Sequence, residues 1–273
     1  MSVRSALESR AALERYCRGE VRSCPVEGTV SAVRVLGGPL VLVDTRDVLL
    51  CTHLAMDGFW ESWVTLAVAR HVRPGWRCVD VGASYGYYTL LLASLVGPAG
   101  RVRACEPNPD VARLLRTTVR LNGFDATVAV SEEVVADRTG EFHLSVPDFA
   151  IGGTMNGSVA AVYPGGRSHP VPGRPLADIC GGEKIDFVKI DAEGGESAIW
   201  EGMGELRRAN PGLTILMEFN RARYPSPAAF VARIRDAGYD LRHVETDGSL
   251  RPTPVPELEA GPAKDWMLWL ARE

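Results

Sequence analysis

The segment from Cys78 to Ala93 combines three features that together specify one local structure. A short apolar run ends at Asp80, Gly82 and Gly86 follow, and apolar residues then recur at helical spacing from Tyr87 to Leu95. A strand, a glycine turn and an amphipathic helix in succession are typical of a nucleotide-binding crossover unit. Glycine serves where the backbone bends sharply or where a ligand approaches it closely. The segment therefore predicts a nucleotide-type cofactor and leaves its identity open.

The same alternation of strands and helices continues along the chain. We expect strands at 77–81, 101–105, 126–130, 185–190 and 213–219, separated by helices at 86–96, 109–121 and 194–206, with a further helix at 226–237. Strands separated by helices of this length predict a parallel sheet with right-handed crossovers. The last two strand-like segments, 240–245 and 265–271, have no helical pattern between them. The chain therefore predicts an α/β, doubly wound sheet that is mostly parallel and has an antiparallel last strand.

The pattern also suggests how the chain is divided. Residues 1–57 read as an N-terminal helix followed by a small β-rich lead-in that includes 48–50, packed on the core. Residues 58–273 read as the cofactor-binding domain, which starts with a helix from 58 to 72. Within that domain, 139–175 is rich in glycine and proline, so we expect a long, loop-like insertion. Its part from 148 to 175, with Thr154, Asn156 and Ser158, is expected to close over the acceptor.

Composition and charge exclude several classes of protein. The net charge of -4 leaves no basic excess to neutralise nucleic-acid phosphates, so we expect no nucleic-acid partner. No run of eighteen apolar residues appears, so we expect no membrane span. The six cysteines are scattered and none forms a CxxC pair, which favours a reducing compartment over disulfides or zinc. We predict a cytoplasmic protein, and its oligomeric state stays open.

The glycine spacing distinguishes between two kinds of cofactor. A dinucleotide site needs G-x-G-x-x-G, whose middle glycine lets a pyrophosphate approach the backbone. Here the turn contains only Gly82 and Gly86, four positions apart and preceded by Asp80. S-adenosylmethionine carries no phosphate, and Glu106 at the end of the next strand can accept hydrogen bonds from its ribose hydroxyls. The sequence therefore predicts S-adenosylmethionine, with the alternative that Glu106 only caps the helix after Pro107.

Three blocks of sequence resemble the FkbM-type S-adenosylmethionine-dependent methyltransferases. They are Asp80-Val-Gly-Ala-Ser-Tyr-Gly-Tyr-Tyr-Thr89, Ala104-Cys-Glu-Pro-Asn108 and Asp186-Phe-Val-Lys-Ile-Asp-Ala-Glu-Gly-Gly-Glu196. Gly58-Phe-Trp-Glu61 resembles an upstream Gly-x-x-Glu element of that family, whereas Ser84 and Tyr88 stand where the family commonly has Asn and Phe. The resemblance implies a class I methyltransferase (Rossmann-like) fold. It also implies methyl transfer to hydroxyl groups, often of sugars or natural products.

The resemblance also implies roles for individual positions. Gly82, Tyr85 and Gly86 would line the methionine portion of the cofactor, and Glu106 would bind the ribose hydroxyls. Glu61 would reach the ammonium or carboxylate end, and the adenine would lie near residues 131–135. The remaining positions that we expect to bind the cofactor are Asp80, Ala83, Thr89, Pro107 and Asn108.

Acidic residues also end the next two strands, where the acceptor is expected. Asp191 should point at the transferred methyl group and accept the substrate's proton, with help from Glu218 and Lys189. Asp191, Glu218 and Asn220 together would offer oxygen ligands to magnesium, which is a possible second cofactor. The alternative is that these three side chains orient substrate hydroxyls by hydrogen bonding.

These features predict an O-methyltransferase that acts on a hydroxylated small molecule of the sugar or natural-product type. Transfer to a nitrogen or a carboxylate stays open. An NAD-dependent oxidoreductase on a similar sheet would need glycine at positions 84 and 87, which are serine and tyrosine. A non-catalytic cofactor-binding protein would be expected to lack the strand-end acids, which are present.

Overall fold

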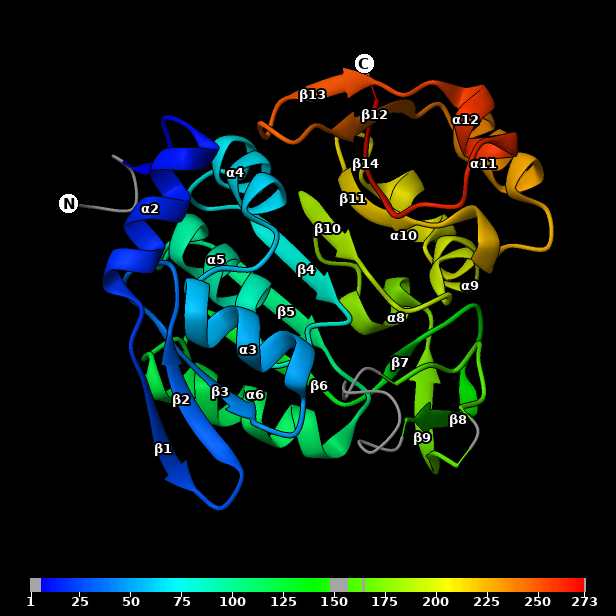
Figure 1. The fold of residues 1–273 in the computed structure, drawn as a ribbon. Helices are drawn as coiled ribbons and strands as arrows, with labels where there is room; N and C mark the ends of the chain where they lie inside the picture. The colour runs from blue at the N-terminus through cyan, green and yellow to red at the C-terminus, as the bar shows by residue number, and fades with distance from the viewer. Residues whose placement is uncertain (1–5, 148–156, 164, 273) are drawn as a thin grey trace.

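An eight-stranded sheet runs through the middle of the molecule (Figure 1). The computed structural model describes residues 6–147, 157–163 and 165–272. In spatial order the strands are β13 (Leu250–Pro252), β12 (Asp240–Val244), β14 (Trp266–Ala271), β11 (Thr214–Phe219), β10 (Phe187–Ile190), β4 (Arg77–Val81), β5 (Arg101–Cys105) and β6 (Val128–Ser131). Strands β11, β10, β4, β5 and β6 are parallel, and β14 is antiparallel to both of its neighbours. The mostly parallel sheet with an antiparallel last strand is therefore confirmed.

Alternate side chains of the central strands enter two separate cores, one on each face of the sheet. Cys78 and Phe187 lie in the first core, whereas their chain neighbours Val79 and Val188 lie in the second. The first core is covered by α4 (Ser62–His71), α5 (Tyr87–Val96) and α6 (Pro109–Leu121). The second is covered by α8 (Leu176–Cys180), α9 (Glu196–Gly202), α10 (Gly204–Ala209), α11 (Pro227–Asp236) and α12 (Val255–Ala260). Helices on both faces make the sheet doubly wound.

The N-terminal segment adds a helix and a small antiparallel sheet to the first core. It consists of α2 (Arg10–Glu20), β1 (Ser23–Glu27), β2 (Val30–Arg34), β3 (Leu40–Asp44) and α3 (Val48–Asp57). The predicted strand at 48–50 is wrong, because the Asp47 side chain accepts a hydrogen bond from the Leu50 amide and starts a helix there. The following helix begins at Ser62 rather than at residue 58, since Gly58 ends α3 in a left-handed conformation.

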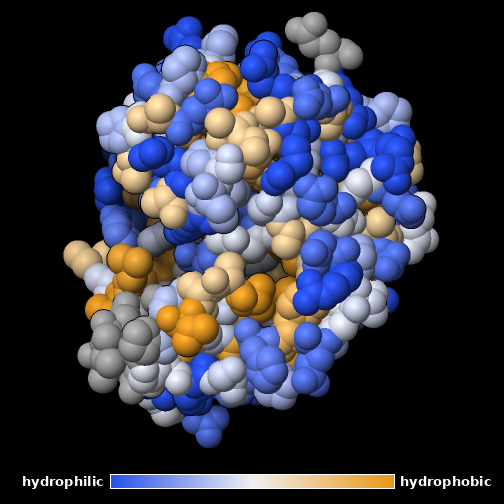
Figure 2. All heavy atoms as spheres, turned by 90° about the vertical axis from the view of Figure 1, so that its right-hand side faces the viewer, coloured by the Kyte–Doolittle hydropathy of each residue, from blue (hydrophilic) through white to orange (hydrophobic). Residues whose placement is uncertain are grey.

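Two strands of the predicted loop between 139 and 175 form a second small sheet with the segment just before it. Strands β7 (Val134–Val135), β9 (Arg167–Arg174) and β8 (Gly140–Val146) lie in that order, and we call them the insertion sheet. Pro170 and Pro172 are two positions apart in β9, so Val171 between them can supply an amide that pairs with β8. Figure 2 shows the face of the molecule that lies on the right in Figure 1. Hydrophobic side chains gather in the lower half of this face, near the insertion sheet, and the upper half is mostly hydrophilic. Thr154 and Asn156, which were expected to contact the acceptor, lie outside the described residues.

Within the described ranges, every helix is too short or too polar to cross a membrane.

Candidate active site

A cavity of about 460 Å³ opens at the carboxyl edge of the parallel strands. The turn after β4, the end of β5, and the segments that follow β10 and β11 all contribute to its wall. Helix α3 adds Leu49, Leu50 and Leu54, and the insertion adds Leu144 and Val159. The cavity therefore lies where a doubly wound sheet binds its ligands, and segments from outside the sheet close it further.

The glycine turn fits tightly against the end of β10. Gly82 has φ +75°, and a Cβ built there would lie 1.8 Å from the carbonyl oxygen of Asp191. The amides of Gly82 and Ala83 both donate to the Cys105 carbonyl at the end of β5. Gly86 serves packing instead, because its Cβ would lie 2.5 Å from a Leu115 methyl group. Only glycine at position 82 lets the turn and β10 approach closely enough to form the cavity floor.

Glu106 presents a buried carboxylate to the cavity from the end of β5. Its two oxygens accept hydrogen bonds from the backbone amides of Ser84 (2.8 Å) and Asn108 (2.9 Å). Burial raises the pKa of Glu106 to about 7, although both amides and Lys189 act in the opposite direction. A carboxylate oxygen can accept more than one hydrogen bond, so Glu106 can still bind a pair of vicinal hydroxyls.

The predicted cofactor residues fall into two groups. Glu61, Gly82, Ala83, Tyr85, Glu106 and Pro107 line the cavity. Asp80, Gly86, Thr89 and Asn108 lie behind it and support the wall. Thr89 donates a 2.7 Å hydrogen bond to the buried Asp80, and Asn108 caps α6 by accepting from the Asp110 amide. These four residues therefore lie outside the lining of the cavity.

The predicted adenine region also lies at the wall. Glu133, Val134 and Val135 line the cavity, and Glu133 is held by Arg174 at 2.6 Å and by Ser131 at 2.8 Å. The Arg174 and Ser131 bonds lower the pKa of Glu133, against the smaller effect of burial. This end combines apolar surface with a fixed carboxylate.

A network of charged and aromatic side chains forms the opposite end. Lys189 is buried, and its Nζ lies 3.2 Å from Asp191, 3.9 Å from Asp80 and 4.7 Å from the centre of the Tyr88 ring. The Tyr88 hydroxyl donates to Glu61 at 2.8 Å. Burial acts to lower the pKa of Lys189, but the surrounding carboxylates outweigh it and the pKa is raised. Lys189 is therefore a permanent cation in this end of the cavity.

Glu61 lies in an unusual backbone conformation at the start of α4. Its φ is +40°, and its side chain makes no capping hydrogen bond to the helix. Burial, together with the nearby Asp191, raises the pKa of Glu61 to about 7. A strained backbone that turns a carboxylate into a cavity is a feature often found at functional sites.

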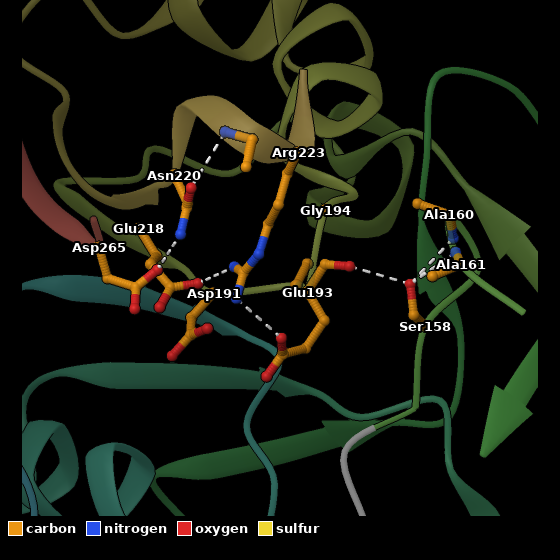
Figure 3. Close-up of polar contacts among 12 residues, drawn as sticks. Ser158, Ala160, Ala161, Asp191, Glu193, Gly194, Glu218, Asn220, Arg223 and Asp265 are labelled. Carbon is orange, nitrogen blue, oxygen red and sulfur yellow. Dashed lines mark hydrogen bonds and ion pairs between the residues drawn. The ribbon is translucent and has the colours of Figure 1, made fainter. Parts of the chain in front are cut away.

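Glu218 and Glu193 line the cavity together with Asp191. Both are held by one guanidinium, that of Arg223 in the short helix η1 (Arg221–Arg223) (Figure 3). Asp191 lies directly beside this pair in the close-up. Burial and the charge of Asp191 raise the pKa of Glu218, while Arg223 acts against them.

Comparison with known proteins identifies the family. Residues 80–241, more than half of the chain, match the methyltransferase FkbM domain. The chain belongs to the FkbM methyltransferase family. Its core is therefore an S-adenosylmethionine-dependent methyltransferase domain, and the predicted class I fold is confirmed.

More distant relatives match shorter segments. A protein-L-isoaspartate O-methyltransferase of Aeropyrum pernix is 43% identical over 58 residues, which cover 21% of this chain and 22% of that protein. A transmembrane O-methyltransferase of Propithecus coquereli is 30% identical over 107 residues, 37% of this chain and 38% of that protein. The chain thus spans well under half the length of these relatives. A solved O-methyltransferase from Bacillus cereus in complex with SAH is 15% identical with a TM-score of 0.47, covering 84% of this chain and 92% of that one.

The FkbM-family cavity fits S-adenosylmethionine by the chemistry of its donor and acceptor groups. Glu106 offers acceptors for ribose hydroxyls, and the glycine turn from Gly82 to Tyr85 contributes to the cavity wall. Glu61 offers a carboxylate to an ammonium group. Apolar residues around Val134 supply a surface for a flat ring.

The predicted magnesium site is not supported. Asn220 uses both ends of its amide, since its Nδ2 donates to Asp265 at 2.8 Å and its Oδ1 accepts from the Ala222 amide at 3.0 Å. Glu218 is paired with Arg223, and a guanidinium beside a carboxylate opposes binding of a second cation. The part of the chain that the structure describes contains no group of three or more His, Cys, Asp or Glu that could hold a metal ion.

Sequence reasoning missed several residues of the site. Trp60 and Trp63 line the cavity, although the segment 58–72 that contains them was predicted only as a helix. Asp265 lines it because β14 is antiparallel, so its first residues lie at the same edge as the end of β11. The predicted antiparallel last strand could therefore have identified Asp265 as a residue of the site. No sequence motif pointed to Arg223, because it meets Glu218 and Glu193 only through the way the chain turns after β11.

Proposed function

We propose that this protein transfers a methyl group from S-adenosylmethionine to a hydroxyl oxygen of a sugar or natural-product-like small molecule. The observation that carries the proposal is the pair of carboxylates, Asp191 and Glu218, which line the cavity from the ends of the adjacent strands β10 and β11, next to the glycine turn. The relatives named above are O-methyltransferases, which supports oxygen as the acceptor atom.

The chain's own residues would bind, orient and take up a proton. Glu106 and Glu61 would hold the two polar ends of the cofactor, and the turn at Gly82 would position it against β10. When bound, S-adenosylmethionine supplies an electrophilic methyl group on a sulfonium. Asp191 would accept the hydroxyl proton of the acceptor, while Lys189 keeps Asp191 in place. Most of the rate enhancement would come from holding the acceptor oxygen in line, within a cavity closed by α3 and the insertion.

Transfer to nitrogen or to a carboxylate remains the alternative within the same class. A protonated amine would be attracted by the carboxylates but would need to lose its proton before attack. An acceptor carboxylate would meet several negative side chains with only two cations, Lys189 and Arg223, on the same side. The charge of this wall therefore favours a neutral hydroxyl.

An NAD-dependent oxidoreductase is the alternative from another class. It requires glycine at positions 84 and 87. Ser84 instead donates its amide to Glu106, and the Tyr87 hydroxyl is buried in a 2.9 Å hydrogen bond with Thr65. A pyrophosphate would therefore meet a side chain where a dinucleotide site has none.

We also propose that the protein acts in the cytoplasm on a small molecule rather than on nucleic acid. All six cysteines are free thiols, and five of them are buried. Free thiols fit a reducing compartment. The net charge of -4 and the acidic cavity would repel a polyanion.

The first experiment separates the cofactor classes. Calorimetry with S-adenosylhomocysteine and with NAD should show tight binding of the former only, and the reverse result would refute the proposal. Release of S-adenosylhomocysteine is then measured with a panel of sugars and phenolic natural products and with their amino and deoxy analogues. Turnover should depend on the hydroxyl, and turnover of only the amino analogues would establish N-methylation instead.

A substitution then tests the acceptor side. Asp191→Asn keeps the size of the side chain but cannot accept the proton, so kcat should fall by about 100-fold or more. Binding of S-adenosylhomocysteine should persist. Asp236→Asn, at an exposed position of α11, is the matched control and should leave both unchanged. Full activity of Asp191→Asn would show that another group takes the proton.

A further inference from the structure

The Tyr88 hydroxyl holds one oxygen of the Glu61 carboxylate, although the two residues belong to different helices. Tyr88 is the second residue of α5, which starts directly after the glycine turn, and Glu61 immediately precedes α4. The hydroxyl donates to Glu61 Oε2 at 2.8 Å. Within the part of the chain that the structure describes, Glu61 Oε1 has no hydrogen bond or ion pair. Because Glu61 lines the cavity, Oε1 is left for a ligand to use.

The ring of Tyr88 is held on two sides, which gives its hydroxyl a defined position. The Lys189 Nζ lies 4.7 Å from the centre of the ring, and the Tyr87 ring packs edge-on with 5.3 Å between the two ring centres. All three side chains are buried. A tyrosine has only two side-chain torsions, so it can hold a partner at a low cost in conformational entropy. Tyr88 therefore fixes the Glu61 carboxylate relative to the glycine turn.

Glu61 depends on this partner because its own helix does not hold the side chain. Its φ is +40°, and the carboxylate makes no capping hydrogen bond to α4. A long side chain that must become ordered when a ligand binds loses rotamer freedom, and that loss weakens binding. A side chain that is already ordered binds without this loss. The hydrogen bond from Tyr88 also goes to a charged acceptor, and such bonds are stronger than those between neutral groups.

We propose that Tyr88 is a positioning residue for the cofactor, whose hydroxyl holds Glu61 Oε2 so that Oε1 receives the ammonium group of S-adenosylmethionine. This inference rests on the proposed function, because it requires the amino-acid end of that cofactor to lie beside Glu61. The hydroxyl is bonded to the carboxylate and not left for the ligand. Tyr88 therefore acts through Glu61, and its effect is confined to ligands that carry the ammonium group.

The test compares two ligands that differ only in the ammonium group. Calorimetry at pH 8, above the pKa of about 7 of Glu61, uses S-adenosylhomocysteine and its analogue with hydrogen in place of the α-amino group. Tyr88→Phe keeps the ring and removes the hydroxyl. It should weaken binding of S-adenosylhomocysteine about tenfold and binding of the analogue by less than about twofold. Tyr239→Phe removes a buried hydroxyl outside the cavity lining, so this matched control should change neither affinity.

A second comparison tests whether Tyr88 acts through Glu61. In protein that carries Glu61→Gln, the ammonium group has already lost its carboxylate partner. Adding Tyr88→Phe to this protein should therefore change the affinity for S-adenosylhomocysteine by less than about twofold, because two substitutions that remove one interaction are not additive. A further tenfold loss in the double variant would show that the hydroxyl acts on the ligand directly, and it would overturn the inference.

The outcomes separate this inference from the proposed function. Equal weakening of both ligands by Tyr88→Phe would assign the hydroxyl to support of the whole cavity wall and would overturn the inference. Unchanged affinity for S-adenosylhomocysteine in Tyr88→Phe would overturn it as well. A wild-type protein that binds S-adenosylhomocysteine and the analogue equally well would also overturn it, and the proposed function would stand. Failure of the wild-type protein to bind S-adenosylhomocysteine would refute the proposed function itself.

Discussion

Gly82 is the residue at which the turn after β4 packs against the segment that follows β10. Its φ of +75° and the 1.8 Å approach of a built Cβ to the Asp191 carbonyl are two separate constraints. Either constraint would favour glycine. Only the close contact with Asp191 links the turn after β4 to the end of β10. A side chain at position 82 would push the turn away from β10 and change the distance between the cofactor and Asp191.

The two constraints can be separated with a matched pair of alanine substitutions. Gly75 also has a positive φ, +82°, yet a Cβ there meets nothing within 4 Å. Gly75→Ala should therefore cost only the backbone strain, about 1–2 kcal/mol in the free energy of unfolding. Gly82→Ala should cost more than about 3 kcal/mol, because the contact with backbone cannot relax.

Denaturant unfolding of both variants measures these costs, and calorimetry with S-adenosylhomocysteine measures the effect on the site. Gly82→Ala should lose binding even where it remains folded. Equal destabilisation by the two substitutions would show that the close approach to Asp191 does not constrain the turn.

At the scale of single residues, the sequence correctly placed in the cavity those residues that lie at or just after the end of a strand. Gly82, Glu106 and Asp191 lie where the alternation of strands and helices places them. Arg223 and Tyr88 could not be assigned in this way, since their partners Glu218 and Glu61 come from other segments. Side-chain pairs of this kind depend on three-dimensional packing that one sequence does not reveal.

At the scale of the elements, the N-terminal sheet is attached to the core through the end of α6. The Asn122 side chain accepts from the Leu40 amide at 2.8 Å and donates to the Leu40 carbonyl at 2.7 Å, so it pairs with the edge of β3 as another strand would. Thr118 accepts from the Leu42 amide at 3.0 Å. These bonds satisfy an edge that would otherwise expose unpaired backbone groups.

Asn122→Ala should therefore weaken the attachment without touching the cavity. We expect a loss of about 1–3 kcal/mol in the free energy of unfolding, because Leu40 loses both of its partners. The affinity for S-adenosylhomocysteine should stay unchanged, since Asn122 does not line the cavity. Arg120→Ala, an exposed neighbour on α6, is the control and should change stability by less than about 0.5 kcal/mol. An unchanged stability of Asn122→Ala would show that the apolar contacts of β3 suffice.

The elements that the sequence predicted best are those whose apolar residues recur with a clear helix or strand period. The segments 77–81, 101–105 and 109–121 match β4, β5 and α6 at both ends. Helix α3 was mistaken for a strand because Val48, Leu49 and Leu50 form a short apolar run, which has no period of its own. The insertion sheet was missed because proline and glycine in β9 are typical of loops, and only its pairing with β8 compensates for them.

At the scale of the whole molecule, the cavity concentrates negative charge that the rest of the chain does not show. The net charge is only -4, yet seven carboxyl side chains line this single cavity: Glu61, Glu106, Glu133, Asp191, Glu193, Glu218 and Asp265. Burial raises the pKa values of Glu61 and Glu106 to about 7. Ionisation of these buried carboxyl groups therefore destabilises the folded protein, and a ligand with an ammonium and a sulfonium group would offset that effect.

Glu61 provides the cleanest measurement of this effect. Its pKa is about 7 in the folded protein and 4.5 as its ordinary value, so the folded state holds its proton more tightly. A raised pKa contributes stability that is complete below 4.5 and is lost as the pH rises through 7. Glu61→Gln cannot ionise, and its amide oxygen can still accept the hydrogen bond from Tyr88. The variant should therefore be more stable than the wild type at pH 8, by about 1–3 kcal/mol, and nearly equal to it near pH 4.5.

The same substitution should weaken cofactor binding, because an amide cannot pair with the ammonium of S-adenosylhomocysteine. We expect the dissociation constant to rise at least tenfold at pH 8, with a smaller difference at pH 6, where the wild-type Glu61 is itself mostly protonated. Urea unfolding at several pH values and calorimetry at the same values measure both effects. A variant that gains stability and keeps its affinity would place Glu61 outside the cofactor site. One that loses affinity without gaining stability would show that the Glu61 carboxylate is not destabilised by its position.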